Sequence, residues 1–160
     1  MKKYKIMIFA AVLILFSALA GCTSPAELLS YRSEDAEFTV DVTDGDLVYS
    51  ARITLESGKP ALLTFLSPEE AEGISLYADG GVAYIGNGVG IPFSEKESGA
   101  VFGLLRVVSS LPEDVKTVIT TEFNGEKVYR CETADGAVFV TGEGDPTGFS
   151  AGNLTATVKR

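Results

Sequence analysis

The sequence predicts a mainly β (α+β) protein built on a single antiparallel sheet of about nine strands, with one packed helix and short helical turns. Two observations carry the sheet. Apolar and polar residues alternate in many short segments, as in strands with one buried face. Asp44-Gly45, Asn124-Gly125 and Asp135-Gly136 separate several of these segments, and such pairs accept the positive φ values that tight hairpin turns require.

The strands follow in order along the chain. The first predicted hairpin joins residues 38–42 and 47–55 and has one wet face. The remaining predicted strands are residues 61–66, 74–79, 82–85, 117–123, 127–133, 137–141 and 154–159. The Gly- and Pro-containing segment 142–152 is predicted to connect the last two.

One long helix is predicted between the two groups of strands. Its apolar residues recur at spacings of three and four, namely Val101, Leu104, Leu105, Val108 and Leu111. Ser94 and Glu97 offer a capping box at its start, and Pro112 ends it. Because glycine weakens a helix, Gly103 indicates a close packing contact or a bend. Shorter helical turns are predicted at residues 24–27 and 67–70.

The amino terminus has the features of a secretory signal. Three lysines precede an apolar run over residues 6–20, which as a helix would span only about 22 Å against a hydrocarbon core of about 30 Å. Its end, Leu19-Ala20-Gly21-Cys22, resembles the lipobox of bacterial lipoproteins. That resemblance implies cleavage before Cys22 and a diacylglycerol on its thiol; the alternative is a plain signal with an incidental cysteine. Two or three acyl chains would anchor the protein stably.

We therefore expect a signal peptide at residues 1–21, a lipidated tether at 22–35 and an antiparallel β domain at 36–160, on the extracytoplasmic face of a bacterial cell membrane. Loss of residues 1–21 would remove three lysines and leave 10 Lys and Arg against 22 Asp and Glu, a net charge of −12. This charge disfavours nucleic acid as a partner, since cations must replace the counterions of phosphates. It also disfavours flat contact with an anionic bilayer.

The chemistry-bearing residues give no catalytic site. The chain has no histidine, so Ser150 within the G-x-S-x-G pattern of residues 148–152 lacks the usual base, and we expect a flexible turn there rather than a nucleophile elbow. Asp41, Asp44 and Asp46 do not match a calcium loop and are interpreted as surface acids. We expect no metal, no cofactor and no enzymatic activity.

Cys131 would have no intramolecular partner if Cys22 is a thioether. It lies in an alternating segment and is interpreted as a small buried side chain, with a reactive or intermolecular thiol as the alternative. The glycine-rich residues 86–90 lack the G-x-G-x-x-G spacing of a dinucleotide site and are interpreted as a loop.

The order of the predicted elements over residues 36–160 resembles the LolA, LolB and LppX-like group of lipoprotein carriers and lipid-binding lipoproteins. The resemblance includes the first hairpin, Ser67-Pro68 before residues 74–81, the amphipathic helix and the final hairpins with Gly144-Asp145-Pro146. It implies a curved half-barrel enclosing an apolar cavity. Apolar residues of the predicted elements would line that cavity: Phe38, Tyr49, Phe65, Leu76, Tyr84, Phe102 and Leu105.

Two functions stay open at this point. In the first, the membrane-anchored protein binds or carries a lipid or another apolar ligand in the half-barrel. In the second, the same side chains fill an ordinary core, and the domain is an accessory or interaction module for another envelope protein, with Tyr31, Tyr77 or the 86–93 loop as the contact.

Overall fold

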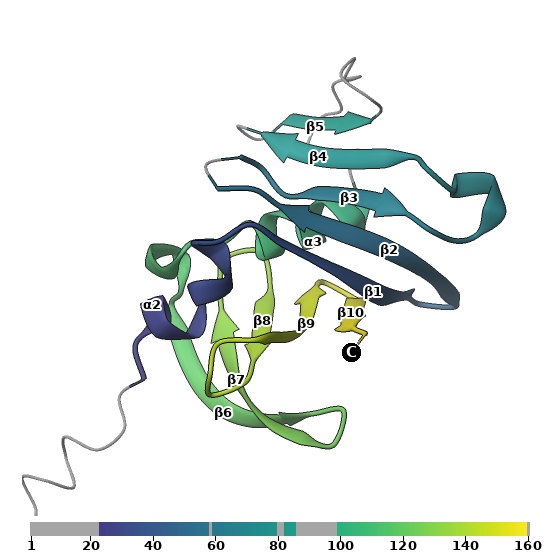
Figure 1. The fold of residues 1–160 in the computed structure, drawn as a ribbon. Helices are drawn as coiled ribbons and strands as arrows, with labels where there is room; N and C mark the ends of the chain where they lie inside the picture. Colours follow the sequence, from purple (N-terminus) through teal and green to yellow (C-terminus); the bar gives the residue numbers. More distant parts are fainter. Residues whose placement is uncertain (1–22, 58, 80–81, 86–98, 160) are drawn as a thin grey trace, which may run out of the picture.

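The computed structural model describes residues 23–57, 59–79, 82–85 and 99–159. In this part of the chain, ten strands form one antiparallel sheet in the order β5-β4-β3-β2-β1-β10-β9-β8-β7-β6 (Figure 1). The strands are β1 Ala36–Asp44, β2 Leu47–Leu55, β3 Leu62–Phe65, β4 Ser75–Asp79, β5 Val82–Ile85, β6 Thr117–Phe123, β7 Glu126–Glu132, β8 Ala137–Val140, β9 Pro146–Ala151 and β10 Leu154–Val158. The predicted fold class is confirmed.

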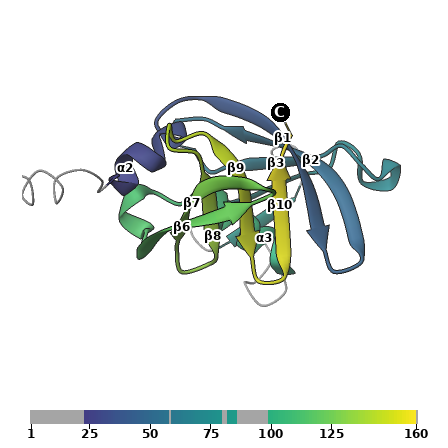
Figure 2. The same ribbon diagram turned by 90° about the horizontal axis from the view of Figure 1, so that it is seen from below.

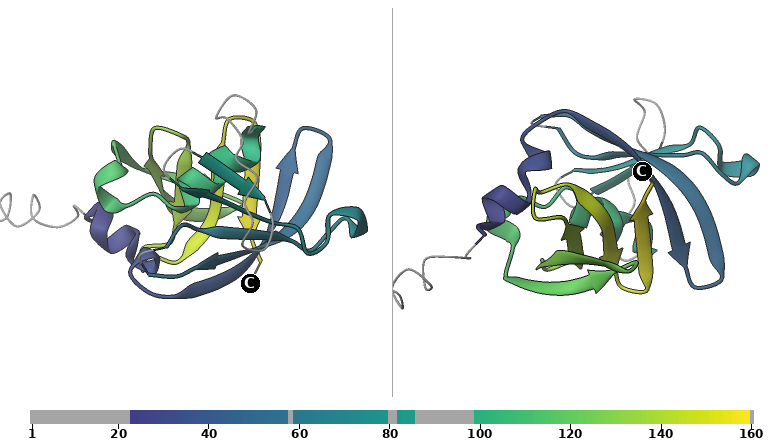
Figure 3. Two further views of the ribbon diagram at one scale, coloured as in Figure 1. Left: turned by 90° about the horizontal axis from the view of Figure 1, so that it is seen from above. Right: turned by 60° about the horizontal axis from the view of Figure 1, so that its bottom comes forward.

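The sheet is strongly curved, and the chain crosses its concave side once. β5 and β6 are neighbours in sequence but form opposite edges of the sheet. The crossing contains α3 (Gly99–Val108), which lies between the β2–β4 and β8–β9 parts of the sheet in Figure 1 and contacts β4, β8, β9 and β10. Figures 2 and 3 show the same curvature from other directions. The concave side therefore holds the core.

The alternation predicted for the first hairpin is confirmed. Val40 and Val42 of β1 and Ala51, Ile53 and Leu55 of β2 are buried in the core. The intervening Glu37 and Arg52 lie on the opposite face, where they form an exposed ion pair at 3.4 Å. One face of this long hairpin thus belongs to the core and the other to solvent.

The prediction of a flexible turn at residues 148–152 is wrong, because these residues belong mainly to β9. This strand pairs with both β8 and β10, and Phe149 is fully buried. Pro146 and Gly148 are uncommon in strands, so the sequence disfavours a strand here. The structure nevertheless requires a small residue at position 148. A Cβ there would lie 2.4 Å from the Phe123 ring and 2.7 Å from the Ala156 carbonyl oxygen.

Phe123 belongs to a second, smaller apolar cluster on the convex side of the sheet. Its ring stacks on Phe139 with centroids 4.3 Å apart, beside Val128 and Ala137. At the tip of the β6–β7 hairpin, the Asn124 amide donates to the Thr157 hydroxyl of β10 at 3.2 Å. The end of this hairpin therefore folds across the outer surface of β9 and β10.

α3 is shorter than predicted but packs as expected. It ends at Val108, whereas Leu111 lies beyond it and is exposed. A methyl group on Gly103 would lie 3.3 Å from the Cβ of Ala151, so the close contact predicted for this glycine is confirmed. The predicted cap residues Ser94 and Glu97 fall outside the described residues. After the helix comes the short turn η3 (Pro112–Asp114), and η2 (Glu69–Ala71) follows Ser67-Pro68.

The residues before β1 pack on the domain. The helical turn α2 (Pro25–Leu28) has the predicted cap: the Ser24 amide donates to the Glu27 carboxylate at 3.0 Å, and the Glu27 amide donates to the Ser24 hydroxyl at 3.3 Å. Leu28 and Leu29 are buried in the core. A second turn, η1 (Ser30–Arg32), leads to β1. The packed domain thus includes residues that the sequence assigned to the tether. None of the described helices has the length and apolar character needed to cross a membrane.

Candidate functional site

Of the residues predicted to line a cavity, six lie along the concave side of the sheet, in two groups. Leu76, Phe102 and Leu105 are buried in the core, whereas Phe38, Tyr49 and Phe65 are partly buried and pack against it. Tyr84 lies in β5 opposite Tyr77, and its side chain is outside the described part. The structure therefore brings six of the seven residues to one face of the fold, where some are fully buried and others only partly.

The middle of the concave side is filled by α3. Phe102, Leu104, Leu105, Val107 and Val108 are all buried, so the helix buries most of its circumference, as a core helix does. The tight approach of Gly103 to Ala151 leaves no room for a ligand between the helix and β9. At this point the half-barrel has a solid core.

One end of the concave side is closed by α2 and η1. There the Phe38 ring stacks on Phe149 with centroids 5.7 Å apart, and the Tyr31 ring meets Phe149 edge-on at 6.4 Å. The Tyr31 hydroxyl is buried without a hydrogen-bond partner, and burial raises its pKa. Tyr31 is therefore not the exposed contact residue that the sequence suggested. Beside it lies an open cleft of about 290 Å³ with Glu34, Asp35 and Asp145 on its walls.

The other end, toward the tip of the β1–β2 hairpin, carries a second aromatic pair. The Tyr49 and Phe65 rings are tilted by 55° with centroids 5.2 Å apart. The hairpin extends beyond α3 in Figure 1, and the turn η2 follows β3 on the same side of the molecule. At the tip, Leu47 and Val48 expose 68% and 70% of their surface. By strand alternation, Leu47 shares the concave face with Tyr49, and Val48 does not.

The Tyr49 hydroxyl is the polar group of this end. It is buried and has no hydrogen-bond partner. Burial, together with the negative charge of Asp44, raises the pKa of Tyr49 to about 12, so the group stays protonated and can donate. We call Leu47, Tyr49 and Phe65 the hairpin-end site.

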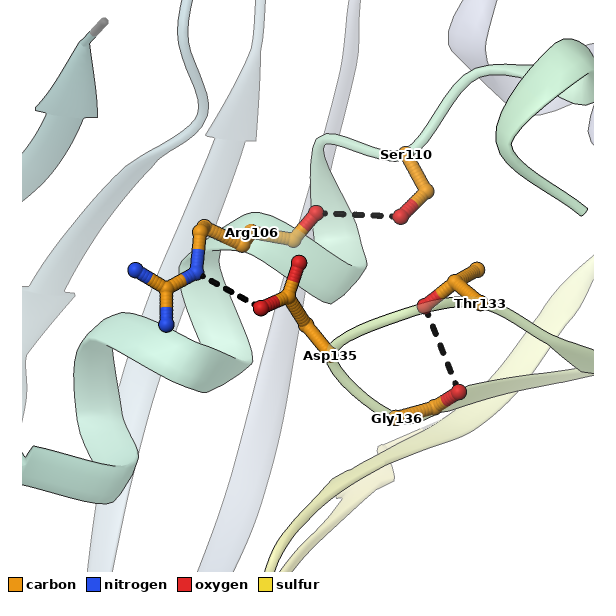
Figure 4. A network of polar contacts seen from close by, with 5 residues as sticks. All are labelled: Arg106, Ser110, Thr133, Asp135 and Gly136. Atoms are coloured by element: carbon orange, nitrogen blue, oxygen red, sulfur yellow. Dashed lines mark hydrogen bonds and ion pairs between the residues drawn. The ribbon is translucent and has the colours of Figure 1, made fainter. Parts of the chain in front are cut away.

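A polar cleft that the sequence did not predict lies at the carboxyl end of α3 (Figure 4). The Arg106 guanidinium donates to the Asp135 carboxylate at 2.9 Å, and the Ser110 hydroxyl donates to the Arg106 carbonyl at 3.1 Å. The cleft measures about 450 Å³, and Glu113, Asp114 and Lys116 also line it. The cleft contains both acidic and basic side chains, and they are close to solvent. Its residues come from α3, η3 and the β7–β8 turn, so no sequence motif could indicate it.

Of the groups considered for catalysis or metal binding, Asp44 lies beside the hairpin-end site, where it pairs with Leu47, and the others have structural surroundings of their own. Ser150 lies in β9 between Ala137 and Thr155 of the neighbouring strands rather than on a strand-to-helix turn. Asp41 accepts from Lys159 at 2.7 Å and also from Ser50, and these hydrogen bonds lower its pKa. No group of three or more potential metal ligands occurs in the described residues. Cys131 is buried, and burial raises its pKa to about 11, which makes the thiol unreactive.

Comparisons with known proteins assign no family to this chain. No protein-family model matches the sequence, and no curated protein matches it. Among solved structures, the fold is similar to a LolA superfamily protein from Nitrosomonas europaea. The sequences are 13% identical, the match covers 85% of this chain and 74% of that chain, and the TM-score is 0.44.

Proposed function

We propose that this protein is a lipid-anchored, extracytoplasmic binding protein that catalyses no reaction and takes an apolar ligand with one polar group at the hairpin-end site. The observation that carries the proposal is the buried Tyr49 hydroxyl without a partner, beside the Phe65 ring and the exposed Leu47.

Two groups of the hairpin-end site lack a partner in the described part of the structure: the Tyr49 hydroxyl has no hydrogen-bond acceptor, and the Leu47 side chain has no apolar cover. A buried hydroxyl that makes no hydrogen bond costs roughly 1–3 kcal/mol. A ligand acceptor would recover this cost once the side chains that cover the Tyr49 hydroxyl had moved aside to admit it. Exposed Leu47 and the adjoining aromatic pair would gain free energy if an apolar chain covered them, at roughly 25 cal/mol per Å². A lipid-like molecule supplies both the acceptor and the chain. Small-molecule sites commonly combine an apolar wall with a few placed polar groups in this way.

A second candidate function is an interaction module with a solid core. The tight contact between Gly103 and Ala151 favours it, because the centre of the half-barrel then has no room for a carried lipid. In that case the hairpin tip would contact another envelope protein. The two functions differ in whether a small molecule occupies the hairpin-end site.

Native mass spectrometry of the processed protein, purified from membranes before and after mild organic extraction, tests the proposal. We expect an extractable mass of lipid size at a ratio near one to one. The extracted protein is then titrated with the fluorescent probe N-phenyl-1-naphthylamine. Leu47→Ser should weaken probe binding about tenfold, which corresponds to about 1.4 kcal/mol.

Ile119→Ser is the matched control, since Ile119 is also exposed but lies on β6. It should leave probe binding unchanged. If the protein carries no extractable mass and both variants bind the probe equally, the interaction module is the better reading.

The membrane anchor is tested separately. Replacing Cys22 with Ser in the full chain should abolish metabolic labelling with a fatty acid and lipoprotein-type cleavage, because no other thiol follows the apolar run directly. Labelling that persists would contradict the anchor. The result does not depend on ligand binding.

A further inference from the structure

The edge strand β6 offers an unpaired side of the sheet. It has seven residues, pairs with β7 on one side, and faces no described strand on the other. In Figure 1 it is the outermost strand at the lower left. The opposite edge strand, β5, has only four residues. Among the described strands, β6 therefore presents the longer row of backbone donors and acceptors that face no neighbouring strand.

The sequence of β6 lacks the usual protection of an exposed edge. Natural edges are commonly guarded by lysine, proline, a bulge or a covering element. Thr117–Phe123 contains no proline and no lysine, and five of its seven residues are β-branched. Its only charge is Glu122, and Ile119 is 41% exposed. The strand is thus suited to accept another strand.

We propose that β6 pairs antiparallel with β6 of a second copy of this chain, centred on Thr120. This register is the one that pairs all seven residues, and it is symmetric, as a twofold interface requires. It sets Val118 opposite Glu122 of the second copy and Ile119 opposite Thr121. Each exposed β-branched side chain then gains a cross-strand neighbour.

Glu122 and Lys116, the residue just before the strand, are complementary in this register. Continued alternation places Lys116 on the same face as Glu122, one step diagonally from Glu122 of the second copy, within reach of a long side chain. The symmetry produces this contact twice, and no like charges face each other. A partner strand of unrelated sequence would not in general place a glutamate opposite Lys116 and a lysine opposite Glu122.

The interaction is weak in dilute solution. One pair of strands buries less than the roughly 1,200 Å² of a stable interface, and both chains are acidic. If both copies are anchored in one membrane, as proposed above, their effective concentration rises and pairing becomes favourable. The pairing itself follows from the strand and does not require the anchor.

Cysteine cross-linking of the full chain in cells tests the register. Thr120→Cys would place two thiols on directly opposed residues, with Cα atoms about 4.5–5.5 Å apart, which suits a disulfide. Ile119→Cys is the control on the same strand, because residues 119 of the two copies are offset by two positions and lie about 8 Å apart, beyond disulfide reach. Cys131 is buried. Cys22 is present in both variants, so any dimer formed through it would appear equally in the two.

We expect a disulfide dimer on a non-reducing gel for Thr120→Cys and at least about fivefold less for Ile119→Cys. Adding Lys116→Glu to Thr120→Cys should reduce the dimer, and the further change Glu122→Lys should restore it. Absence of the dimer, equal yields at 119 and 120, or failure of the charge reversal to restore it would overturn the proposal. None of these results depends on the hairpin-end site or on probe binding.

Discussion

Replacing Phe149 with Ala tests whether β9 is a central strand. Phe149 is fully buried, and its ring contacts the rings of Phe38 and Tyr31. Truncation of a buried phenylalanine typically costs about 3–5 kcal/mol, because apolar contacts are lost and a cavity remains. The contacts with two aromatic neighbours favour the upper half of that range, since aromatic pairs add about 0.5–1.5 kcal/mol beyond burial.

The assay is urea unfolding of residues 23–160, which contain every described helix and strand. With a slope of about 2 kcal/mol per molar urea, a loss of 4 kcal/mol lowers the midpoint by about 2 M at an unchanged slope. Ser150→Ala is the matched control in the same strand and should change stability by less than about 0.5 kcal/mol. The reasoning is refuted if Phe149→Ala costs under about 1 kcal/mol, or if Ser150→Ala costs as much.

Two further predictions concern ionisable groups. Cys131, with its pKa raised to about 11 by burial, should react with maleimide at pH 8 only as fast as the protein opens, and full reactivity in native protein would contradict its burial. The lowered pKa of Asp41 contributes stability that is present above the ordinary carboxyl pKa and is lost as pH falls through the folded value. Asp41→Asn should therefore reduce the acid dependence of the unfolding free energy below about pH 4, and an unchanged dependence would show that Lys159 and Ser50 do not act on it.

The sequence predicted the elements whose signals are local. The β1–β2 hairpin follows from alternation around Asp44-Gly45, and the cap of α2 follows from Ser24 and Glu27. β9 was missed because its neighbours, rather than its own alternation, make it a strand: Gly148 is small to accommodate Phe123, which is distant in sequence. The burial of Leu28 and Leu29 was missed for the same reason.

The candidate site was predicted only in part. Alternation correctly placed Tyr49 and Phe65 on the concave side, but it could not show that α3 fills the centre and leaves these two at one end. The buried hydroxyl of Tyr49 depends on three-dimensional packing. The polar cleft around Arg106 and Asp135 joins segments 29 residues apart, so no spacing rule could reveal it.

The packing of Leu28 and Leu29 against the core determines how the domain would sit on a membrane. These two residues fix the turn α2 to the core, and the Ser24 cap begins it. Only Thr23 separates Ser24 from Cys22, a span of at most about 7 Å. An acylated Cys22 would thus be a very short tether. It would hold the α2 end of the domain close to the lipid and restrict the domain's orientation. The tip of the β1–β2 hairpin, at the far end of the molecule in Figure 1, would face whatever approaches from outside.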